Sequence, residues 1–226
     1  MKVFEINKEH YRDWVLNKHY AKRMPSITYA YGLFIDEKMV GVASYGRPMA
    51  HSLVKGAFKG KWMDTFLELN RLCVNDGLEK NTLSFFLSKT LKMLPKPNVV
   101  VSYADTSMNH NGYIYQATNW IYTGLSAKRK DYKIKGYEHL HSASIMDKVR
   151  GVKKGKVQAL KDTFGEGNVY TEDRPRKHRY FYFLGSKSEK KDMLRNLSYK
   201  IEQYPKGENK RYDASYQPKI VHLRAI

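Results

Sequence analysis

The sequence predicts a fold of the α/β or α+β class, on three observations. Residues 27–35 alternate apolar and small or polar side chains, as a half-buried strand does. Apolar residues recur at helical spacing over residues 81–94, between two apolar runs at 65–74 and 98–103. The length of 226 residues suits one domain, or one domain with an extension. Strands and helices therefore alternate along a chain that can bury a substantial core.

Five strands are predicted in the first half of the chain. They are alternating or continuous apolar runs bounded by turn residues, and they span residues 3–6, 27–35, 39–44, 65–74 and 98–103. The triplet Asp36-Glu37-Lys38 turns the second strand into the third, and Asn75-Asp76-Gly77 ends the fourth. The segment 47–61, which contains Gly and Lys, is expected to be a loop.

Two helices are predicted between these strands. The first, residues 8–19, gathers its large apolar side chains on one face: Tyr11, Trp14 and Val15. The second begins at a capping residue, Asn81 or Thr82, and is ended by Pro95 and Pro97. A shorter helix-like stretch follows the fifth strand and contains Tyr115.

The C-terminal part contains a polar insertion. Later strands are predicted at residues 120–124, 132–139 and 179–184. The insertion, about 142–177, includes a helical pattern at 156–164 and separates the last two strands of the sheet. Residues 186–204 predict a basic helix, followed by an irregular tail. We therefore expect one main domain over 1–185 that includes the insertion, and a basic extension over 186–226.

Composition excludes some classes of protein. No stretch is apolar for long enough to span a membrane, and the N-terminus lacks a signal-peptide pattern. The single cysteine, Cys73, has no partner for an intrachain disulfide, which favours a reducing cytoplasm. Cys73 lies in an apolar run and is expected to fill the core rather than to act as a nucleophile.

The net charge favours a polyanionic partner. The chain has 41 Lys and Arg against 22 Asp and Glu, a formal charge of +19 spread along its length. It also has 18 tyrosines, and several of them lie within three positions of a lysine or arginine, among them Tyr132, Tyr137, Tyr180, Tyr182, Tyr199 and Tyr212. Basic side chains bind phosphates and aromatic faces stack on bases, so nucleic acid is the expected partner. A merely solvated basic surface is the alternative.

The segment from Val99 to Gly124 has more polar side chains than a plain connection between a strand and a helix needs. A β-branched run ends in Asp105, and a loop with His110 and a stretch with Tyr115 follow. A buried strand that places a carboxylate at its C-terminal end is typical of active sites in α/β proteins. Ordinary capping of a strand, turn and helix is the competing interpretation.

The order of short motifs resembles the Mom family of phage DNA adenine-modification proteins, which are similar to the GNAT acetyltransferases. Besides Val99–Gly124, these motifs are His19-Tyr20 with Arg23 and Pro25, Gly32-Leu33-Phe34, Gly41-Val42, Tyr45-Gly46-Arg47-Pro48, Leu69-Asn70-Arg71-Leu72, Lys177-His178-Arg179-Tyr180 and Tyr204-Pro205-Lys206. The resemblance implies a GNAT-like mixed sheet, split near its middle and flanked by helices. It also implies acetyl-CoA or another coenzyme A derivative as cofactor.

In such a fold the turn between the fourth strand and the second helix would hold the coenzyme pyrophosphate. The residues implied are Arg71, Lys80, Thr82 and Ser84. The chain departs from the usual GNAT pattern here, because Gly77 is the only glycine in the turn. A plain strand-to-helix connection is the alternative.

The resemblance also implies catalytic roles for four residues: Asp105, Tyr115, His19 and Tyr20. Many acetyltransferases carry a tyrosine that protonates the coenzyme thiolate, four residues before a glycine and an aromatic residue. Tyr115 has that spacing to Asn119-Trp120, with Asn in place of Gly. Tyr113 is the alternative proton donor, and core packing is the other reading of Tyr115.

Basic residues of the insertion and of the following strand are expected to contact nucleic acid: Lys153, Lys154, Lys156, Arg176, Lys177 and Arg179. His139 and His141 would lie on one face of a strand, a spacing that suits a metal, but the sequence offers no third ligand. No metal site is therefore expected, although a requirement for metal stays open.

The predicted function is a phage enzyme that binds double-stranded DNA in the host cytoplasm. By resemblance it converts adenine to N6-carbamoylmethyladenine and protects phage DNA from restriction. The methyltransferase motif for adenine, Asp/Asn-Pro-Pro-Tyr, is absent from the sequence, which argues against simple methylation. Two alternatives remain open: a GNAT N-acetyltransferase acting on RNA or another acceptor, and a non-catalytic DNA-binding protein on a GNAT scaffold.

Overall fold

A computed structural model of the chain describes residues 1–140, 142–153 and 155–207. The chain divides into two compact units, and each is described by itself. Unit 1 contains residues 1–125 together with the chain from Lys177 onward, and unit 2 contains residues 126–176. The insertion therefore begins at residue 126 in the structure, earlier than the 142 expected from the sequence.

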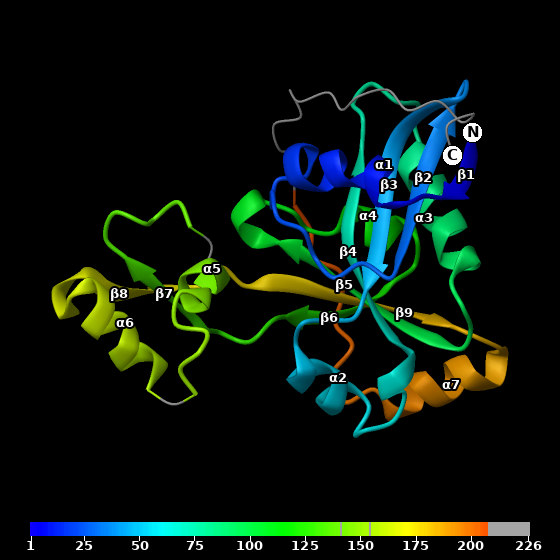
Figure 1. Ribbon diagram of the computed structural model, residues 1–226. Helices are drawn as coiled ribbons and strands as arrows, with labels where there is room; N and C mark the ends of the chain where they lie inside the picture. Colours follow the sequence, from blue (N-terminus) through cyan, green and yellow to red (C-terminus); the bar gives the residue numbers. More distant parts are fainter. Residues whose placement is uncertain (141, 154, 208–226) are drawn as a thin grey trace. The chain divides into compact units, whose positions relative to one another are not determined.

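Unit 1 is built on a mixed sheet of seven strands in the order β1-β2-β3-β4-β5-β9-β6 (Figure 1). The strands are β1 (Lys2–Glu5), β2 (Tyr29–Ile35), β3 (Lys38–Gly46), β4 (Phe66–Val74), β5 (Asn98–Asp105), β6 (Ile121–Leu125) and β9 (Lys177–Leu184). Among the strand pairs of this sheet that the described residues form, β4–β5 alone is parallel. The mixed α/β fold predicted from the sequence is confirmed.

The sheet splits between its two central strands. β4 and β5 are paired only from Phe66 opposite Val99 to Glu68 opposite Val101. Beyond that point β4 stays paired with β3 as far as Val74, whereas β5 stays paired with β9 to its end. The two strands therefore diverge, and one edge of β4 is left open toward β5. This opening positions the site described below.

Helices cover both faces of the sheet (Figure 1). α3 (Thr82–Met93) and α4 (Tyr113–Ala117) pack on one face, where Leu33, Tyr45 and Leu69 form the largest buried cluster with them. α1 (Lys8–Asp13) continues as a π-helix over Trp14–Lys18 and packs on the other face. The predicted helix at 8–19 is thus confirmed, although its second half is wound as a π-helix.

The segment expected to be a loop at residues 47–61 contains a helix. α2 (His51–Ala57) is followed by the short 3-10 helix at Met63–Thr65. Leu53, Ala57 and Phe58 are buried against strands β4, β5 and β9 and against α7. Burial of one apolar face therefore stabilises a short helix whose Gly56 and lysines favour a loop when considered alone.

The C-terminal helix is shorter than expected. α7 (Lys187–Asn196) begins at a capping box formed by Ser186 and Glu189, and Leu197 already has extended backbone angles. The following residues run along the sheet edge: the Glu202 N–H donates to the Tyr122 carbonyl at 3.0 Å. The expectation of a helix to residue 204 was wrong, because this segment packs in extended form. Most of the predicted irregular tail lies outside the described residues.

Unit 2 has its own small sheet and core. β7 (Lys130–Ile134) pairs with β8 (Val169–Asp173), and α5 (Ser142–Asp147) and α6 (Lys156–Phe164) complete the unit. Ile134, Ile145, Val149 and Leu160 form its buried cluster. The strand expected at 132–139 therefore belongs to this hairpin and not to the main sheet.

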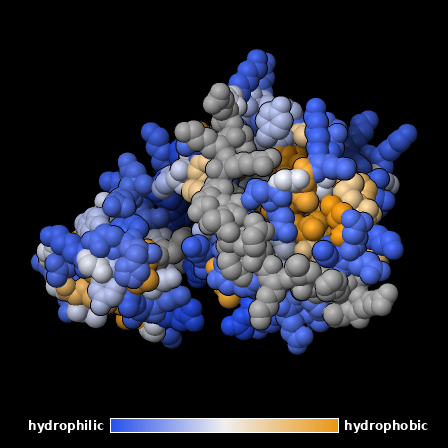
Figure 2. Space-filling model, turned by 90° about the horizontal axis from the view of Figure 1, so that it is seen from above, coloured by the Kyte–Doolittle hydropathy of each residue, from blue (hydrophilic) through white to orange (hydrophobic). Residues whose placement is uncertain are grey.

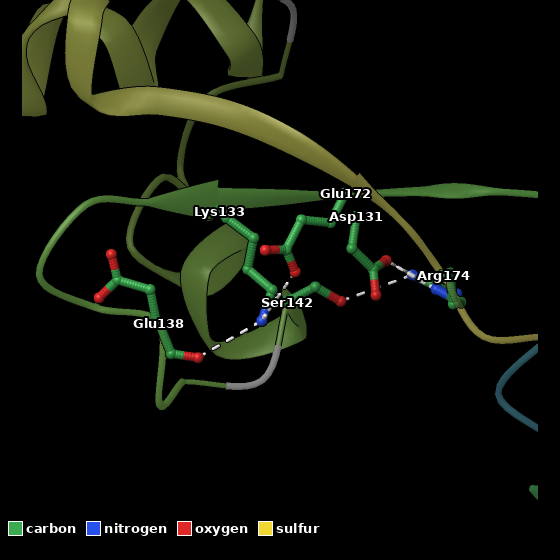
Figure 3. Close-up of polar contacts among 6 residues, drawn as sticks. All are labelled: Asp131, Lys133, Glu138, Ser142, Glu172 and Arg174. Carbon is green, nitrogen blue, oxygen red and sulfur yellow. Dashed lines mark hydrogen bonds and ion pairs between the residues drawn. The ribbon is translucent and has the colours of Figure 1, made fainter. Parts of the chain in front are cut away.

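Polar contacts brace the hairpin of unit 2 (Figure 3). Arg174 donates from Nε to the carboxylate of Asp131 at 2.6 Å and from Nη2 to the Ser142 hydroxyl at 3.5 Å. The Lys133 ammonium lies 4.0 Å from the carboxylate of Glu172. Because acidic partners neutralise these two cations, they are poor candidates for phosphate contacts.

The face of the molecule drawn in Figure 2 is mostly hydrophilic, as the net charge of +19 leads one to expect. Within the described part of the chain, no helix is both long enough and apolar enough to cross a membrane. Cys73 is buried as a free thiol among apolar side chains of unit 1, as predicted.

Candidate active site at the split of the sheet

A cavity of about 570 Å³ opens where β4 and β5 diverge. Its walls come from the end of the π-helix, from β4 and the turn after it, from the start of α3, from β5 and from α4. It gathers seven of the residues predicted from the sequence: His19, Tyr20, Arg71, Lys80, Thr82, Ser84 and Tyr115. Asp105 does not line it, although its charge acts on Tyr20. A cavity of this size suits a small-molecule ligand.

The N-terminus of α3 presents unsatisfied donors to the cavity. Among the described residues, the backbone N–H groups of Leu83 and Ser84 have no hydrogen-bond acceptor. The Thr82 hydroxyl is buried and also has no partner there. Ser84 is partly exposed, and its hydroxyl donates to the Asn81 carbonyl at 2.9 Å. These donors, together with the helix dipole, favour an anion.

Two further predicted residues flank this helix start. Lys80 is exposed at the rim of the cavity. Arg71 on β4 donates from Nη1 to the Asn70 carbonyl and from Nη2 to the Arg23 carbonyl, both at 2.6 Å. Within the described part of the chain, Arg71 Nε is buried without a partner. Arg71 therefore fixes the chain near Arg23 and keeps one donor available.

His19 and Tyr20 form one wall of the cavity immediately after the π-helix. Their rings stack with centroids 4.4 Å apart, and Tyr20 meets His110 edge-on at 5.7 Å. Burial, together with the charge of Arg71, lowers the pKa of His19 to about 3. His19 Nδ1 accepts the Ala21 N–H at 3.2 Å, so the proton of the neutral ring is on Nε2. His19 is therefore a neutral donor at physiological pH.

Asp105 is held as a carboxylate at the end of β5. Burial opposes its ionisation, but hydrogen bonds from the Ser107 hydroxyl at 2.6 Å and the Ser107 N–H at 3.0 Å favour the charged form. The Lys177 ammonium lies 2.9 Å from the other carboxylate oxygen. Together these partners hold the pKa of Asp105 below its usual range. This arrangement caps the turn after β5 and makes Asp105 a weak proton acceptor.

Tyr115 lies on α4 and is buried between the rings of Trp120 and Tyr180. Its hydroxyl is hydrogen bonded to Ser102 Oγ at 2.8 Å, and burial raises its pKa to about 12. The hydroxyl therefore keeps its proton at neutral pH, and its raised pKa makes it a weaker acid than an exposed tyrosine. The alternative donor, Tyr113, is two-thirds exposed (67%) and lines the same cavity.

Two backbone conformations fix α4. Asn119, where the acetyltransferase pattern has Gly, has φ +59°, a value that Asn tolerates better than most residues. Gly112 precedes the helix with φ +72°, and a Cβ there would lie 2.4 Å from the Tyr180 ring. The positive φ and the close Tyr180 ring therefore favour glycine at position 112.

No role is predicted from the sequence for three residues at or near the cavity. His110 and Ser102 line the cavity. Glu68 lies at the split of the sheet, and its charge acts on both Arg71 and Tyr115. The signal for Glu68 was a carboxylate within the otherwise apolar run Phe66-Leu67-Glu68-Leu69.

The residues predicted to bind nucleic acid differ in their exposure to solvent and in their partners. Lys153 and Lys156 are exposed on unit 2, whereas Lys154 lies outside the described residues. Arg176 donates from Nε to the Ser126 carbonyl at 2.6 Å, and Lys177 pairs with Asp105. Both are therefore already engaged.

Arg179 does not suit the expected phosphate contact. It is buried, donates twice to Thr123 at 2.9 Å, and lies 3.5 Å above the ring of Tyr199. Because its guanidinium is used inside unit 1, we reassign Arg179 to the packing of β6 and β9 against the C-terminal segment.

No cluster of three His, Cys, Asp or Glu residues with metal-binding geometry occurs within the described residues. His139 lies in a turn after β7 and not on a strand, and His141 lies outside the described residues.

Comparison with known proteins agrees with the motif order. A sequence model of the Mom protein family matches residues 1–206. The methylcarbamoylase Mom of Escherichia phage Mu is 27% identical over 210 residues, which cover 86% of this chain and 79% of that protein.

Two solved structures are also similar. One is an N-acetyltransferase from Staphylococcus aureus Mu50, with 11% identity, a TM-score of 0.43, and coverage of 80% of this chain and 97% of that chain. The other is yncA from Salmonella typhimurium with its cofactor acetyl-CoA, with 12% identity, a TM-score of 0.43, and coverage of 82% and 95%. Since the family match extends over residues 1–206, the chain belongs to the Mom protein family.

Proposed function

We propose that this chain is a transferase that modifies the exocyclic N6 amine of adenine in DNA, giving N6-carbamoylmethyladenine. Membership of the Mom family over residues 1–206 is the observation that carries the proposal, because it supports a phage DNA-modification protein. The relative from phage Mu bears the name methylcarbamoylase, which supports the group transferred. The cavity at the split of the sheet supplies a site for such chemistry.

A group on N6 would protect DNA for a simple reason. The N6 amine is the hydrogen-bond donor that adenine presents in the major groove, where restriction enzymes read it. In a duplex this amine is also engaged in the base pair. We therefore propose that the adenine is flipped into the cleft, beside the stacked rings of His19 and Tyr20.

A coenzyme A derivative fits the other side of the cavity. The Leu83 and Ser84 N–H groups and the Thr82 hydroxyl are donors without acceptors among the described residues, as a pyrophosphate site requires. Lys80 at the rim adds a positive charge. When bound, the coenzyme supplies an activated acyl group as a thioester. The product is joined through a methylene, so a second donor or an additional step is also required.

The coenzyme is tested by calorimetric titration of coenzyme A and acetyl-CoA. We expect Ser84→Asp to abolish binding, because a carboxylate at the start of α3 repels the pyrophosphate. Ser88→Asp, one turn further along α3, is the matched control and should bind as the wild type does. If the wild-type protein binds neither compound at millimolar concentration, the cofactor assignment is wrong.

Unit 2 supplies positive charge for DNA. Over residues 126–176 the sequence has 13 Lys and Arg against seven Asp and Glu. Lys153 and Lys156 are exposed there and form no ion pair with any described residue. If about six phosphates are neutralised, log K for DNA should fall with log salt at a slope of roughly −5.

Two variants test this contribution. Lys153→Gln with Lys156→Gln should reduce the slope by about 2 on every DNA sequence. Lys2→Gln with Lys8→Gln changes the net charge equally on unit 1 and should leave the slope unchanged. Leu125 is paired with His178 in β6 and β9, so residues 127–176 can be replaced by an Asn-Gly turn. That variant should lose most DNA affinity, and unaltered binding would remove unit 2 from the interface.

The function itself is tested by restriction of plasmid DNA from bacteria that express the chain. We expect resistance to enzymes whose sites contain adenine, and normal cleavage at sites made only of G and C. Plasmid DNA prepared in parallel from bacteria that express the Tyr115→Phe variant should be cut at both kinds of site. Equal cleavage of the wild-type plasmid at both kinds of site would contradict adenine modification, and would favour an RNA acetyltransferase or a non-catalytic DNA-binding protein.

A further inference from the structure

Tyr113 is the most exposed aromatic residue that lines the cavity at the split of the sheet. It is the first residue of α4, and 67% of its surface is exposed. Within the described part of the chain, its ring contacts no other aromatic ring and its hydroxyl has no hydrogen-bond partner. The ring therefore presents open aromatic surface at the wall of the cavity.

Two other tyrosines of this cavity have rings that are already covered. Tyr115 is buried between two further aromatic rings. Tyr20 is stacked on His19, with ring centroids 4.4 Å apart. Aromatic rings are normally buried or paired on folding, because their large apolar surface is unfavourable in water. The exposed ring of Tyr113 contributes little to the core and is suited to pack against a ligand.

The backbone that carries Tyr113 is held firmly. The Tyr180 hydroxyl donates to the Asn111 carbonyl at 2.6 Å, and Gln116 Nε2 donates to the same carbonyl at 2.9 Å. The Gln116 N–H donates to the Gly112 carbonyl at 3.1 Å and closes the first turn of α4. Because the chain before Tyr113 is fixed from β9 and from α4, a ligand that packs on the ring orders little backbone.

The same cavity contains an anion site at the start of α3. Its donors are the Leu83 and Ser84 N–H groups and the Thr82 hydroxyl. α3 and α4 pack on the same face of the sheet, so these donors and the Tyr113 ring line one cavity from neighbouring helices. Donors for a phosphate beside an exposed aromatic ring are the features that bind the two ends of a nucleotide.

We propose that Tyr113 is the stacking platform for an adenine ring that binds in this cavity. The inference rests on the proposed function, in which two ligands carry that ring: the target nucleotide of DNA and coenzyme A. A ring that stacks contacts the face of the base and leaves its edge, with the N6 amine, accessible. Tyr113 is therefore a binding residue and takes no part in proton transfer.

The test is calorimetric titration of the full chain with two pairs of ligands that differ in the adenine ring. One pair is coenzyme A and 4′-phosphopantetheine, which lacks the adenine nucleotide. The other is a short strand of abasic residues with one central deoxyadenosine, and the same strand without it. Tyr113→Ala removes the ring, and Tyr113→Phe keeps it without the hydroxyl. Phe4→Ala, at an exposed aromatic residue of β1 outside the cavity, is the matched control.

We expect Tyr113→Ala to weaken binding of the adenine-containing ligand about 5- to 150-fold in at least one pair, the effect of removing one aromatic platform from a stacked base. The ligand without adenine should bind unchanged, and Tyr113→Phe and Phe4→Ala should bind as wild type does. A loss confined to coenzyme A assigns the platform to the coenzyme. A loss confined to the deoxyadenosine strand assigns it to the target base, and a loss in both pairs assigns it to both rings.

Three results would overturn the assignment: unchanged affinities in Tyr113→Ala, equal losses for ligands with and without adenine, or a loss in Tyr113→Phe as large as in Tyr113→Ala. Because the side chain is exposed, the melting temperature of each variant should stay near wild type, which excludes unfolding as the cause of a loss. A wild-type protein that binds neither coenzyme A nor the deoxyadenosine strand would contradict the proposed function and this inference together. Wild-type binding that Tyr113→Ala retains in full would refute the role of Tyr113 alone.

Discussion

The free energy of unfolding of this protein should depend on pH through the protonation of His19. The perturbation is a change from pH 7 to pH 5. In the folded chain the pKa of His19 is about 3 because the ring is buried, whereas the unfolded value is 6.5. Between these values the unfolded state binds the proton and the folded state does not. Stability therefore falls as the pH drops through this window.

The magnitude follows from the pKa difference. At pH 5 the unfolded His19 is almost fully protonated and the folded one is neutral, so the loss relative to pH 7 is about 2 kcal/mol. We expect urea unfolding to report this loss as a lower midpoint with an unchanged slope. His19→Asn lacks the titrating ring but keeps an oxygen acceptor, so it isolates the contribution of His19 from that of the other histidines.

The free energy of unfolding is measured at pH 7 and at pH 5 for the wild type and for His19→Asn, and the losses between the two pH values are compared. Wild type should lose about 2 kcal/mol more. If both proteins lose the same amount, the His19 ring is not held neutral by burial, and its assignment as a neutral donor beside Tyr20 would be wrong.

Three further outcomes are expected. Tyr115→Phe removes only a hydroxyl, so the melting temperature should stay within a few degrees of wild type, which is about the effect of one hydrogen bond. DNA modification should slow about 10²-fold. A large drop in melting temperature would point to a packing role for Tyr115. Arg179→Met should lower the unfolding free energy by about 2–3 kcal/mol in urea, because two buried hydrogen bonds and the contact with Tyr199 are lost, without changing the salt dependence of DNA binding. Asp105→Asn removes a carboxylate with a lowered pKa, so it should be destabilised at pH 7 and should lose the part of the acid sensitivity that wild type shows below about pH 4.

The sequence predicted most of the sheet because its strands have strong local patterns. The alternation at residues 27–35 and the apolar run at 98–103 need no tertiary context to be recognised. The split between β4 and β5 followed from resemblance, whereas its position at Glu68 is visible only in the pairing of the strands.

The errors arose where tertiary contacts decide the conformation. α2 is helical because Leu53 and Phe58 are buried, which no local pattern in residues 47–61 reveals. α7 ends at Asn196 because the following residues bond to β6, and Arg179 is buried by contacts with Thr123 and Tyr199. Basic residues look alike in a sequence, whether they face solvent or are stacked inside.

The candidate site was predictable as a set of residues but not as a set of roles. His19, Tyr20, Arg71, Ser84 and Tyr115 come from distant parts of the sequence, and the structure places them around one cavity. Protonation is set by burial and by neighbours, and neither can be read from residue type. The carboxylate on β5 is saturated with donors, while the one on β4, overlooked in the sequence, has the raised pKa.

The central claim is best tested by mass spectrometry of nucleosides from plasmid DNA of bacteria expressing this chain. Hydrolysis of the DNA to nucleosides followed by fragmentation shows both whether deoxyadenosine carries an added group and what that group is. We expect a deoxyadenosine whose base carries a carbamoylmethyl group, present with the wild-type protein and strongly reduced with Tyr115→Phe. Unmodified deoxyadenosine, or an acetyl group on RNA nucleosides from the same cells, would contradict the account.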